Sequence, residues 1–294
     1  MKLGLGTVQF GMGYGISNQQ GQTPVDEVAR ILSVAQRNNI RIVDTAALYG
    51  TSEESLGMVM PAGHTFRIVT KTVRFDAPRP SITLHDAELL ESSFERSLQK
   101  LKSPTLYGLL LHNVKDLLAS GGNLLYERMV TVKNRGLVSK IGVSVYAAEE
   151  IDRVLDAYDI DLIQLPVNVL DQRLITGGQL KKLKAAGVEI HARSPLLQGL
   201  LLMEPETLSP FFDSVKAHLK MYRAFLSKNG ITPVQAAVGF AAAVEEIDAV
   251  ICGVNNHRQL EELCAAPALN NMNFHQFAIN DDTILNPSKW LTNP

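Results

Sequence analysis

Residues 40–50 read Ile-Arg-Ile-Val-Asp-Thr-Ala-Ala-Leu-Tyr-Gly. The apolar run at 40–43 predicts a short buried strand. Asp44 then stands at the carboxyl end of this strand, and Tyr49 follows in the loop or first helical turn beyond it. An acid and a phenol directly after a buried strand indicate a polar site at the end of a sheet.

Two later strands also end in a titratable side chain. An apolar run precedes Lys71, and three consecutive leucines precede His112. The carboxyl ends of parallel strands lie on the same side of a barrel or sheet. We therefore expect Lys71 and His112 to converge with Asp44 and Tyr49 in one site of a parallel α/β protein.

Short apolar runs alternate with helical patterns along the chain. The pattern predicts strands at 3–8, 40–43, 66–70, 106–111, 141–143, 162–165, 188–192 and 248–252. It predicts helices at 24–38, 52–60, 86–101, 122–135, 147–157, 178–186, 213–228, 232–243 and 256–265. Eight strand–helix units in 294 residues fit a closed (β/α)8 TIM barrel.

We expect a single domain over residues 1–294, with a tail from about residue 267 that borders the active site. No linker, charge block or low-complexity segment divides the chain. A doubly wound open sheet is the alternative fold. The glycines at 4–15 do not match the G-x-G-x-x-G pattern of a dinucleotide-binding loop, so a Rossmann site is not expected.

The composition argues against several classes of protein. A formal net charge of −2 provides no basic field for nucleic acid or an anionic membrane. The two cysteines, Cys252 and Cys264, predict reduced thiols rather than a disulfide framework or a zinc site. Neither a signal peptide nor an apolar run of about 18 residues is recognisable. We expect a cytoplasmic protein without nucleic-acid or membrane partners, and no pattern indicates an oligomeric state.

The four polar groups have complementary chemistry. A tyrosine with a pKa near ~10 becomes a useful acid when a cation stabilises its phenolate. Lys71 can be that cation, and Asp44 can keep a buried Lys71 charged. His112 can hydrogen-bond a substrate oxygen or pass a proton to Tyr49. This set suits carbonyl reduction, and a nicotinamide cofactor is implied because no side chain can supply hydride.

Other interpretations remain open at this point. Each of the four residues alone has an ordinary structural interpretation, such as a helix cap or a packed ring, although their joint placement favours a site. A Schiff-base aldolase could use Lys71, but Asp44 would hold that lysine protonated. A metal hydrolase is disfavoured because His85, His112 and His191 are not spaced as paired ligands, so no metal is expected.

The chain resembles the aldo-keto reductases in these motifs. The most specific one is Asp-Thr-Ala-Ala-Leu-Tyr-Gly-Thr-Ser-Glu-Glu-Ser-Leu-Gly at 44–57, joined by Lys71 after a strand and Leu-His-Asn at 111–113. The likeness covers nearly the whole chain, and less specific stretches lie at 3–7, 141–144, 164–168, 193–196 and 253–262.

This resemblance implies a (β/α)8 barrel that reduces an aldehyde or ketone with NAD(P)H bound in an extended form. It implies that Tyr49 is the general acid and that Lys71 lowers the pKa of Tyr49. It also implies that Asp44 pairs with Lys71 and that His112 orients the carbonyl. A non-catalytic, cofactor-binding regulatory subunit of the same barrel family is the main rival.

The resemblance also assigns cofactor contacts. Ser144 and Gln164 match positions that hold the nicotinamide carboxamide, while Val145 stands where the family commonly has Asn. Three residues lie where the family wraps the pyrophosphate: Ser194, Leu196 and Gly199. Five lie in a stretch similar to the adenosine-phosphate segment: Gly253, Asn255, Arg258, Gln259 and Glu262.

Arg258 favours NADPH over NADH, because relatives that prefer NADPH often have a basic residue in this segment. Leu263 argues the other way, since it replaces an Asn common in those relatives. The substrate is expected to be a small carbonyl compound, and the polar loop at 15–20 favours a sugar-like one. Candidate pocket residues, with ordinary surface positions as the alternative, are Tyr14, Phe75 and Trp290 for apolar contacts and Arg74 and Arg79 for an anionic substrate.

Overall fold

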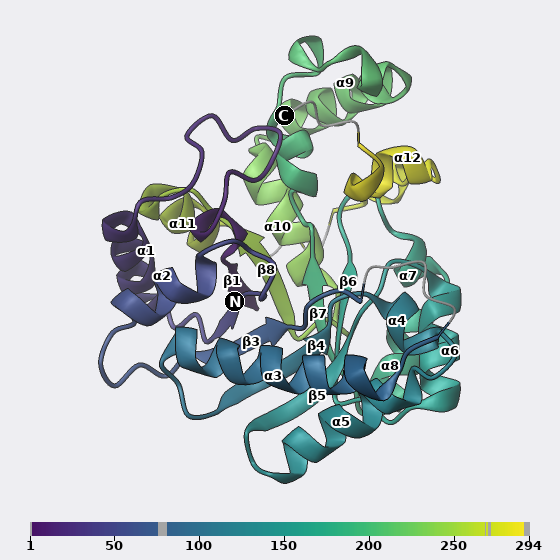
Figure 1. Cartoon of the computed structure of the whole chain (residues 1–294). Helices are drawn as coiled ribbons and strands as arrows, with labels where there is room; N and C mark the ends of the chain where they lie inside the picture. The colour runs from purple at the N-terminus through teal and green to yellow at the C-terminus, as the bar shows by residue number, and fades with distance from the viewer. Residues whose placement is uncertain (1, 76–80, 268, 270–271, 291–294) are drawn as a thin grey trace.

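A computed structural model describes residues 2–75, 81–267, 269 and 272–290. Within these residues, parallel strands β1 to β8 close into a barrel in chain order, with β1 paired to β8 (Figure 1). The strands are β1 (Leu3–Gly6), β2 (Ile42–Asp44), β3 (Arg67–Lys71), β4 (Leu106–Leu111), β5 (Val138–Ser144), β6 (Leu162–Pro166), β7 (Glu189–Arg193) and β8 (Ala249–Gly253). The predicted (β/α)8 barrel is confirmed, and the open doubly wound sheet is excluded.

Helices surround the barrel on its outer side (Figure 1). The longer ones are α1 (Val25–Arg37), α2 (Ser52–Val59), α3 (Leu84–Leu101), α5 (Asn123–Asn134), α6 (Ala148–Ala157), α8 (Gln179–Ala185), α9 (Asp213–Lys228), α10 (Pro233–Ala243) and α11 (His257–Cys264). Three are a single turn or little more: α4 (Val114–Leu118), α7 (Arg173–Thr176) and α12 (Asp282–Leu285).

Side-chain alternation along the strands separates two apolar regions. Ile42, Val69 and Leu110 belong to a small buried cluster shared by several strands. Their neighbours Val43 and Ile68 belong instead to the large core that includes the surrounding helices. Successive residues of a strand point to opposite faces, so the short apolar runs fill the barrel and also anchor the helices.

The predicted boundaries differ from the observed ones at a few places. The first strand ends at Gly6, because Val8–Phe10 turns into a 3₁₀ helix. The fifth strand begins at Val138, earlier than the predicted 141. The pattern did not predict α4, α7 or α12, because four or five residues are too few to show a helical period.

Elements α9 and α12 and the loop at 10–22 lie above the same end of the barrel in Figure 1. A second apolar core joins α9 to the tail, and Trp290 is buried in it. The indole nitrogen of Trp290 donates a hydrogen bond to the carbonyl oxygen of Ile284 at 3.0 Å. These contacts hold the tail near the end of the barrel at which strands β2, β3 and β4 finish.

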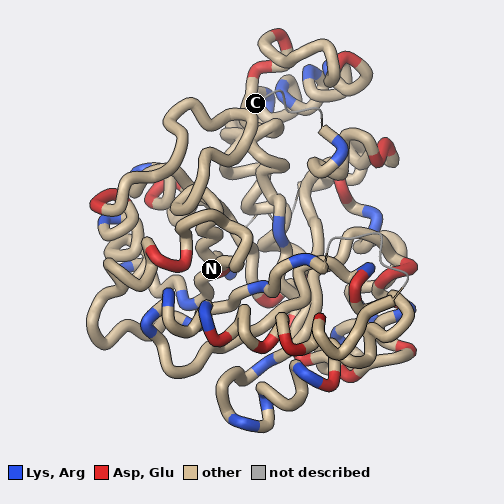
Figure 2. The backbone as a smooth tube through the Cα atoms, viewed as in Figure 1, with Lys and Arg blue, Asp and Glu red and all other residues tan. Residues whose placement is uncertain are grey.

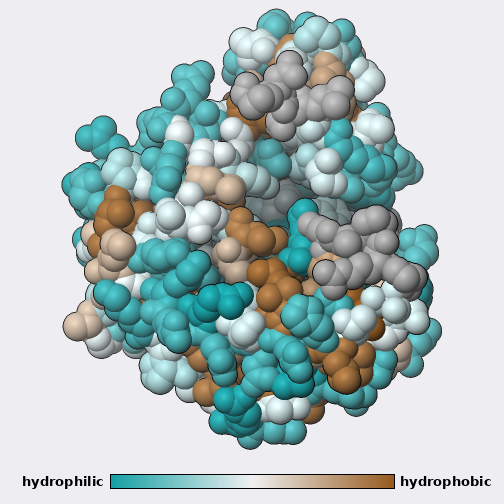
Figure 3. Space-filling view, viewed as in Figure 1, coloured by the Kyte–Doolittle hydropathy of each residue, from teal (hydrophilic) through white to brown (hydrophobic). Residues whose placement is uncertain are grey.

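Charged residues of both signs are spread along the described part of the chain. Basic and acidic residues are interspersed over the trace in Figure 2, in keeping with the net charge of −2. On the face drawn in Figure 3, apolar side chains are scattered among polar ones. Among the described residues, no helix combines the length and the apolarity that crossing a membrane demands.

Candidate active site

The centre of the site is a buried ion pair between Asp44 and Lys71. Asp44 is the last residue of β2 and Lys71 the last of β3, and these strands are neighbours. The Lys71 ammonium donates to both carboxylate oxygens of Asp44, at 2.8 and 2.7 Å. Lys71 is 1% exposed and Asp44 3%. Two charges removed from water to this degree are stable only as a pair.

Tyr49 shares the same ammonium. Lys71 Nζ lies 3.2 Å from the Tyr49 hydroxyl, and it also donates to the carbonyl oxygen of Thr45 at 3.1 Å. Burial raises the pKa of Tyr49, and the nearby Lys71 opposes that rise without reversing it. Tyr49 therefore carries its proton at neutral pH, which is the form that a proton donor needs.

The loop that carries Tyr49 is held against the first βα loop. A methyl group on Gly11 would come within 1.7 Å of the Tyr49 carbonyl oxygen and 2.4 Å of the Ser52 amide nitrogen. Gly50, with a φ of +55°, would bring a methyl group within 2.2 Å of the Gly11 carbonyl oxygen. Glycine is required on both sides of this contact, and the contact fixes the Tyr49 backbone.

His112 follows β4 and approaches Tyr49 edge-on. The ring centroids are 5.9 Å apart with an interplanar angle of 85°. Burial, helped by the charges of Lys71, Arg74 and Arg193, lowers the pKa of His112 to about 3. The imidazole is therefore neutral, and its Nδ1 is buried without a hydrogen-bond partner in the described structure.

Gln164 supplies a partner for Asp44 that is far away in the sequence. Gln164 lies on β6, and its side-chain amide nitrogen donates a hydrogen bond to Asp44 Oδ1 at 2.7 Å. Gln164 is 1% exposed. Besides its place at the expected nicotinamide position, this residue therefore orients the carboxylate that holds Lys71.

A cavity of about 870 Å³ opens beside these side chains. Asp44, Tyr49, Lys71 and His112 all line it. Nine of the ten residues expected to contact a cofactor line it as well: Ser144, Gln164, Ser194, Leu196, Gly199, Gly253, Asn255, Gln259 and Glu262. Arg258, the tenth, is exposed on α11 and is not part of the lining.

The loop after β7 has an unusual backbone. Ser194, Leu197 and Gln198 have φ values of +58°, +47° and +53°. Such conformations are costly for residues other than glycine and are often kept at functional sites. Gln198 also binds the 10–22 loop, since its carbonyl oxygen accepts from the Ile16 amide and its side chain donates to the Tyr14 hydroxyl.

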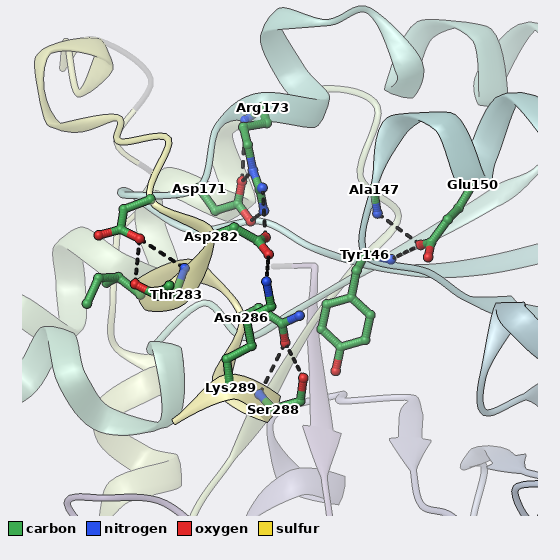
Figure 4. A network of polar contacts seen from close by, with 12 residues as sticks. Tyr146, Ala147, Glu150, Asp171, Arg173, Asp282, Thr283, Asn286, Ser288 and Lys289 are labelled. Carbon is green, nitrogen blue, oxygen red and sulfur yellow. Dashed lines mark hydrogen bonds and ion pairs between the residues drawn. The ribbon is translucent and has the colours of Figure 1, made fainter. Parts of the chain in front are cut away.

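The tail contributes to the lining with Asp282, Asn286, Ser288 and Lys289. Figure 4 shows how these residues are connected to the barrel. Arg173 donates to both carboxylate oxygens of Asp171 at 2.8 and 2.9 Å and reaches Asp282 at 3.2 Å. Asp282 also pairs with Lys289 at 2.6 Å. An arginine between two acids thus connects the tail to the segment after β6.

A family model for the aldo/keto reductase family matches residues 2–282. The chain belongs to the aldo/keto reductase family. This membership agrees with the resemblance that the sequence motifs showed, and it fits the geometry of Asp44, Tyr49, Lys71 and His112.

Two curated aldo-keto reductases, from Mycobacterium sp. strains KMS and JLS, are each 28% identical over 193 residues. The matched region spans 63% of this chain and 64% of each relative. Among solved structures, the holo form of an aldo-keto reductase from Bacillus halodurans superposes with a TM-score of 0.71 at 21% identity, covering 94% of this chain and 89% of that one. A protein assigned as an aldo-keto reductase from Pseudomonas aeruginosa superposes with a TM-score of 0.67 at 23% identity, covering 92% of this chain and 91% of that one.

The pocket residues expected from the sequence of this aldo/keto reductase divide into two groups. Tyr14 and Arg74 line the cavity. Phe75 and Trp290 do not, because both side chains are buried in apolar cores. The expectation that these two aromatic rings line the pocket was wrong, while Arg79 lies outside the described residues.

The sequence analysis missed several lining residues. Gln9 and Tyr146 line the cavity, and so does the side chain of Arg193. Arg193 is the last residue of β7, so the pattern that predicts a site at Lys71, a charged residue at the end of a strand, applies to it as well. Within the described residues, no group of three His, Cys, Asp or Glu side chains could hold a metal ion.

Proposed function

We propose that this protein reduces an aldehyde or ketone to an alcohol with NAD(P)H, and that Tyr49 is the general acid. The main support is one observation: the Lys71 ammonium binds Asp44 and the Tyr49 hydroxyl together at the wall of the cavity. Tyr49 then delivers its proton to the substrate oxygen, and Lys71 stabilises the phenolate that remains.

The other residues have supporting roles in this proposal. Asp44 keeps Lys71 charged, and Gln164 keeps Asp44 in place. His112 is neutral, so it acts as a hydrogen-bond donor to the carbonyl oxygen rather than as a second acid. These groups are ordered before a substrate arrives, which lowers the cost of reorganisation in the transition state.

The cavity fits a nicotinamide dinucleotide in its size and in its unsatisfied polar atoms. The side-chain oxygens of Gln9 and Asn255 are buried without a hydrogen-bond partner, and both residues line the cavity. Buried polar atoms without a partner are rare in native proteins and often mark a ligand contact. When bound, the cofactor supplies the hydride that no side chain can provide.

We propose NADPH as the preferred cofactor, with NADH as the alternative. Arg258 is exposed near the lining residues Asn255 and Gln259, and it forms no ion pair within the described part of the chain. It is therefore free to meet a 2′-phosphate at the rim. Arg258 is not itself part of the cavity lining, but it directly precedes the lining residue Gln259 and would hold the phosphate from there.

We further propose that residues 1–294 form one domain and that the tail borders the site, as the lining residues of the tail support. The substrate in this proposal is a small carbonyl compound of sugar-like polarity, since Ser17 and Asn18 of the polar loop line the cavity. Location in the cytoplasm stays a prediction from the sequence.

The Schiff-base alternative has less support. Burial would lower the pKa of Lys71, but the charges of Asp44 and Tyr49 raise it above the ordinary value. A protonated amine cannot attack a carbonyl. Borohydride trapping of a substrate on Lys71 would restore this alternative.

The test of the proposed function is a panel of aldehydes and ketones, with consumption of NADPH and NADH followed by absorbance. Turnover of at least one carbonyl that is lost in Tyr49→Phe supports the proposal. Cofactor binding without turnover of any panel member favours the non-catalytic regulatory subunit.

A further inference from the structure

Arg193 occupies a position in the site for which the proposed chemistry has no role. It is the last residue of β7 and pairs with Pro166 of β6 at the carboxyl end of the barrel. Its side chain is half-buried and lines the same cavity as Tyr49 and His112. A charged side chain in such a place needs a partner or a function.

The contacts of Arg193 hold the guanidinium without neutralising it. The guanidinium carbon lies 4.0 Å from the centroid of the Tyr146 ring. One terminal nitrogen donates to the Val145 carbonyl oxygen at 3.0 Å, and the other reaches Ser194 Oγ at 3.5 Å. A guanidinium has five N–H donors, so these contacts orient it and leave donors for a ligand.

No carboxylate among the described residues lies within ion-pair distance of Arg193. Three of the acids that line the cavity have other partners. Asp44 binds Lys71, and Asp282 binds Arg173 and Lys289. Glu150 accepts the backbone amides of Tyr146 and Ala147, as Figure 4 shows.

The charge of Arg193 acts directly on the reacting groups. Burial dominates the pKa shifts of Tyr49 and His112, and the positive charge of Arg193 contributes to lowering the pKa of both. Arg74 lines the cavity and acts on His112 in the same direction, and it too has no ion-pair partner within the described ranges. Arg193 and Arg74 thus both line the cavity near His112, and neither has an ion-pair partner among the residues that the structure describes.

We propose that Arg193 binds the carboxylate or phosphate of an anionic carbonyl substrate, and that Arg74 adds to this attraction from the rim. This inference rests on the proposed reductase function and names its substrate class. An oriented guanidinium fits either anion through two parallel N–H donors. Stacking on Tyr146 sets its plane and reduces the entropy lost on binding.

The cofactor is a second source of an anion for Arg193. Ser194, which directly follows Arg193, is expected to contact the diphosphate of the cofactor. The experiment separates the two sources. We would compare kcat/KM for 4-oxobutanoate with that for its methyl ester, and for glyceraldehyde 3-phosphate with that for glyceraldehyde. The dissociation constant of NADPH would be measured alongside by fluorescence. The proteins are the wild type, Arg193→Gln, Arg193→Lys and the control Arg96→Gln, which removes an exposed charge from α3 outside the cavity.

The expected result is a wild-type preference for an anionic member of at least one pair. Arg193→Gln should reduce that preference by about 10- to 100-fold, mainly through KM, the size expected for a lost charge-assisted hydrogen bond. Arg193→Lys should keep part of the preference, and Arg96→Gln should keep all of it. The NADPH dissociation constant should stay unchanged.

Three results would overturn the inference. The wild type could reduce neutral and anionic carbonyls equally well. Arg193→Gln could lower kcat/KM equally for both members of each pair, which would indicate a general structural role. Weaker NADPH binding with an unchanged substrate preference would assign Arg193 to the diphosphate. Failure of the reductase proposal itself would give a different result from these three, because the wild type would then turn over no carbonyl at all.

Discussion

The Lys71 ammonium donates a hydrogen bond to the Tyr49 hydroxyl across 3.2 Å. The same nitrogen stands 2.7 Å from Asp44 Oδ2, so the lysine remains charged although it is 1% exposed. Burial keeps the pKa of Tyr49 above its ordinary value, and the charge of the Lys71 ammonium opposes this rise. This contact joins the buried Asp44–Lys71 ion pair to the phenol that we propose as the proton donor at the cavity wall.

Tyr49→Phe should bind NADPH as the wild type does and should lose reduction by about 10²- to 10⁴-fold, the usual contribution of general acid catalysis. The substitution removes only the hydroxyl. Steady-state rates and a fluorescence titration with NADPH are the two measurements. A rate like that of the wild type would remove Tyr49 from its proposed role.

Lys71→Met should slow reduction at neutral pH and raise the pKa that the pH–rate profile assigns to Tyr49, because the phenolate loses its cation. The variant also leaves Asp44 without its cation, so folding must be checked by circular dichroism. Lys181→Met, on the exposed face of α8, is the control for losing a lysine. An unchanged rate and profile in folded Lys71→Met would show that Asp44 and Lys71 are only a structural pair.

Arg258→Ala should selectively weaken the binding of NADPH. The expected loss of binding free energy is ~1.5–3 kcal/mol, the size of a lost charge-assisted contact. NADH lacks the 2′-phosphate, and its dissociation constant should not change. Isothermal titration with both cofactors measures the difference. Equal affinities in the wild type, or equal losses in the variant, would contradict the assignment of Arg258.

Gly11→Ala should displace the Tyr49 loop, since the new methyl group would come within 1.7 Å of the Tyr49 carbonyl oxygen. We expect a loss of stability of ~1–3 kcal/mol from overpacking and a lower kcat from a misplaced hydroxyl. Gly13→Ala is the matched control in the same loop, because its methyl group would meet nothing closer than 3.5 Å. Similar kcat values in both variants would show that this contact does not position Tyr49.

The acid sensitivity of folding should depend on Glu189 at the opposite end of the barrel. Burial would raise the pKa of Glu189, but hydrogen bonds from His191, Lys140 and Tyr107 lower it to about 2. A carboxylate with a depressed pKa stabilises the fold above its ordinary pKa near ~4.3, and this stability is lost as the pH falls towards 2.

Denaturant unfolding between pH 7 and pH 2 measures this effect. The free energy of unfolding of the wild type should decrease more steeply below pH 5 than that of Glu189→Gln, which has no carboxylate to protonate. Parallel curves for the two proteins would show that Glu189 is not a source of the acid sensitivity.

The sequence by itself determined the barrel and the main catalytic candidates. Apolar runs with polar interruptions mark strands such as β2 and β3, because a strand must bury both faces between the barrel interior and the helices. Asp44 and Lys71 could be placed together from the sequence, since neighbouring parallel strands end at the same rim. His112 follows from the same rule.

Only the tertiary structure decided the partners that come from distant strands. The amide of Gln164 reaches Asp44 across 120 positions of sequence, and Arg193 is oriented by Tyr146 across 47. Barrel closure sets which side chains face each other, and no local period encodes that choice. The same holds for Trp290, which was expected to line the pocket and instead is buried in the apolar core beside α9. Burial of a large aromatic ring contributes more free energy of folding than a half-exposed position at the rim of the cavity.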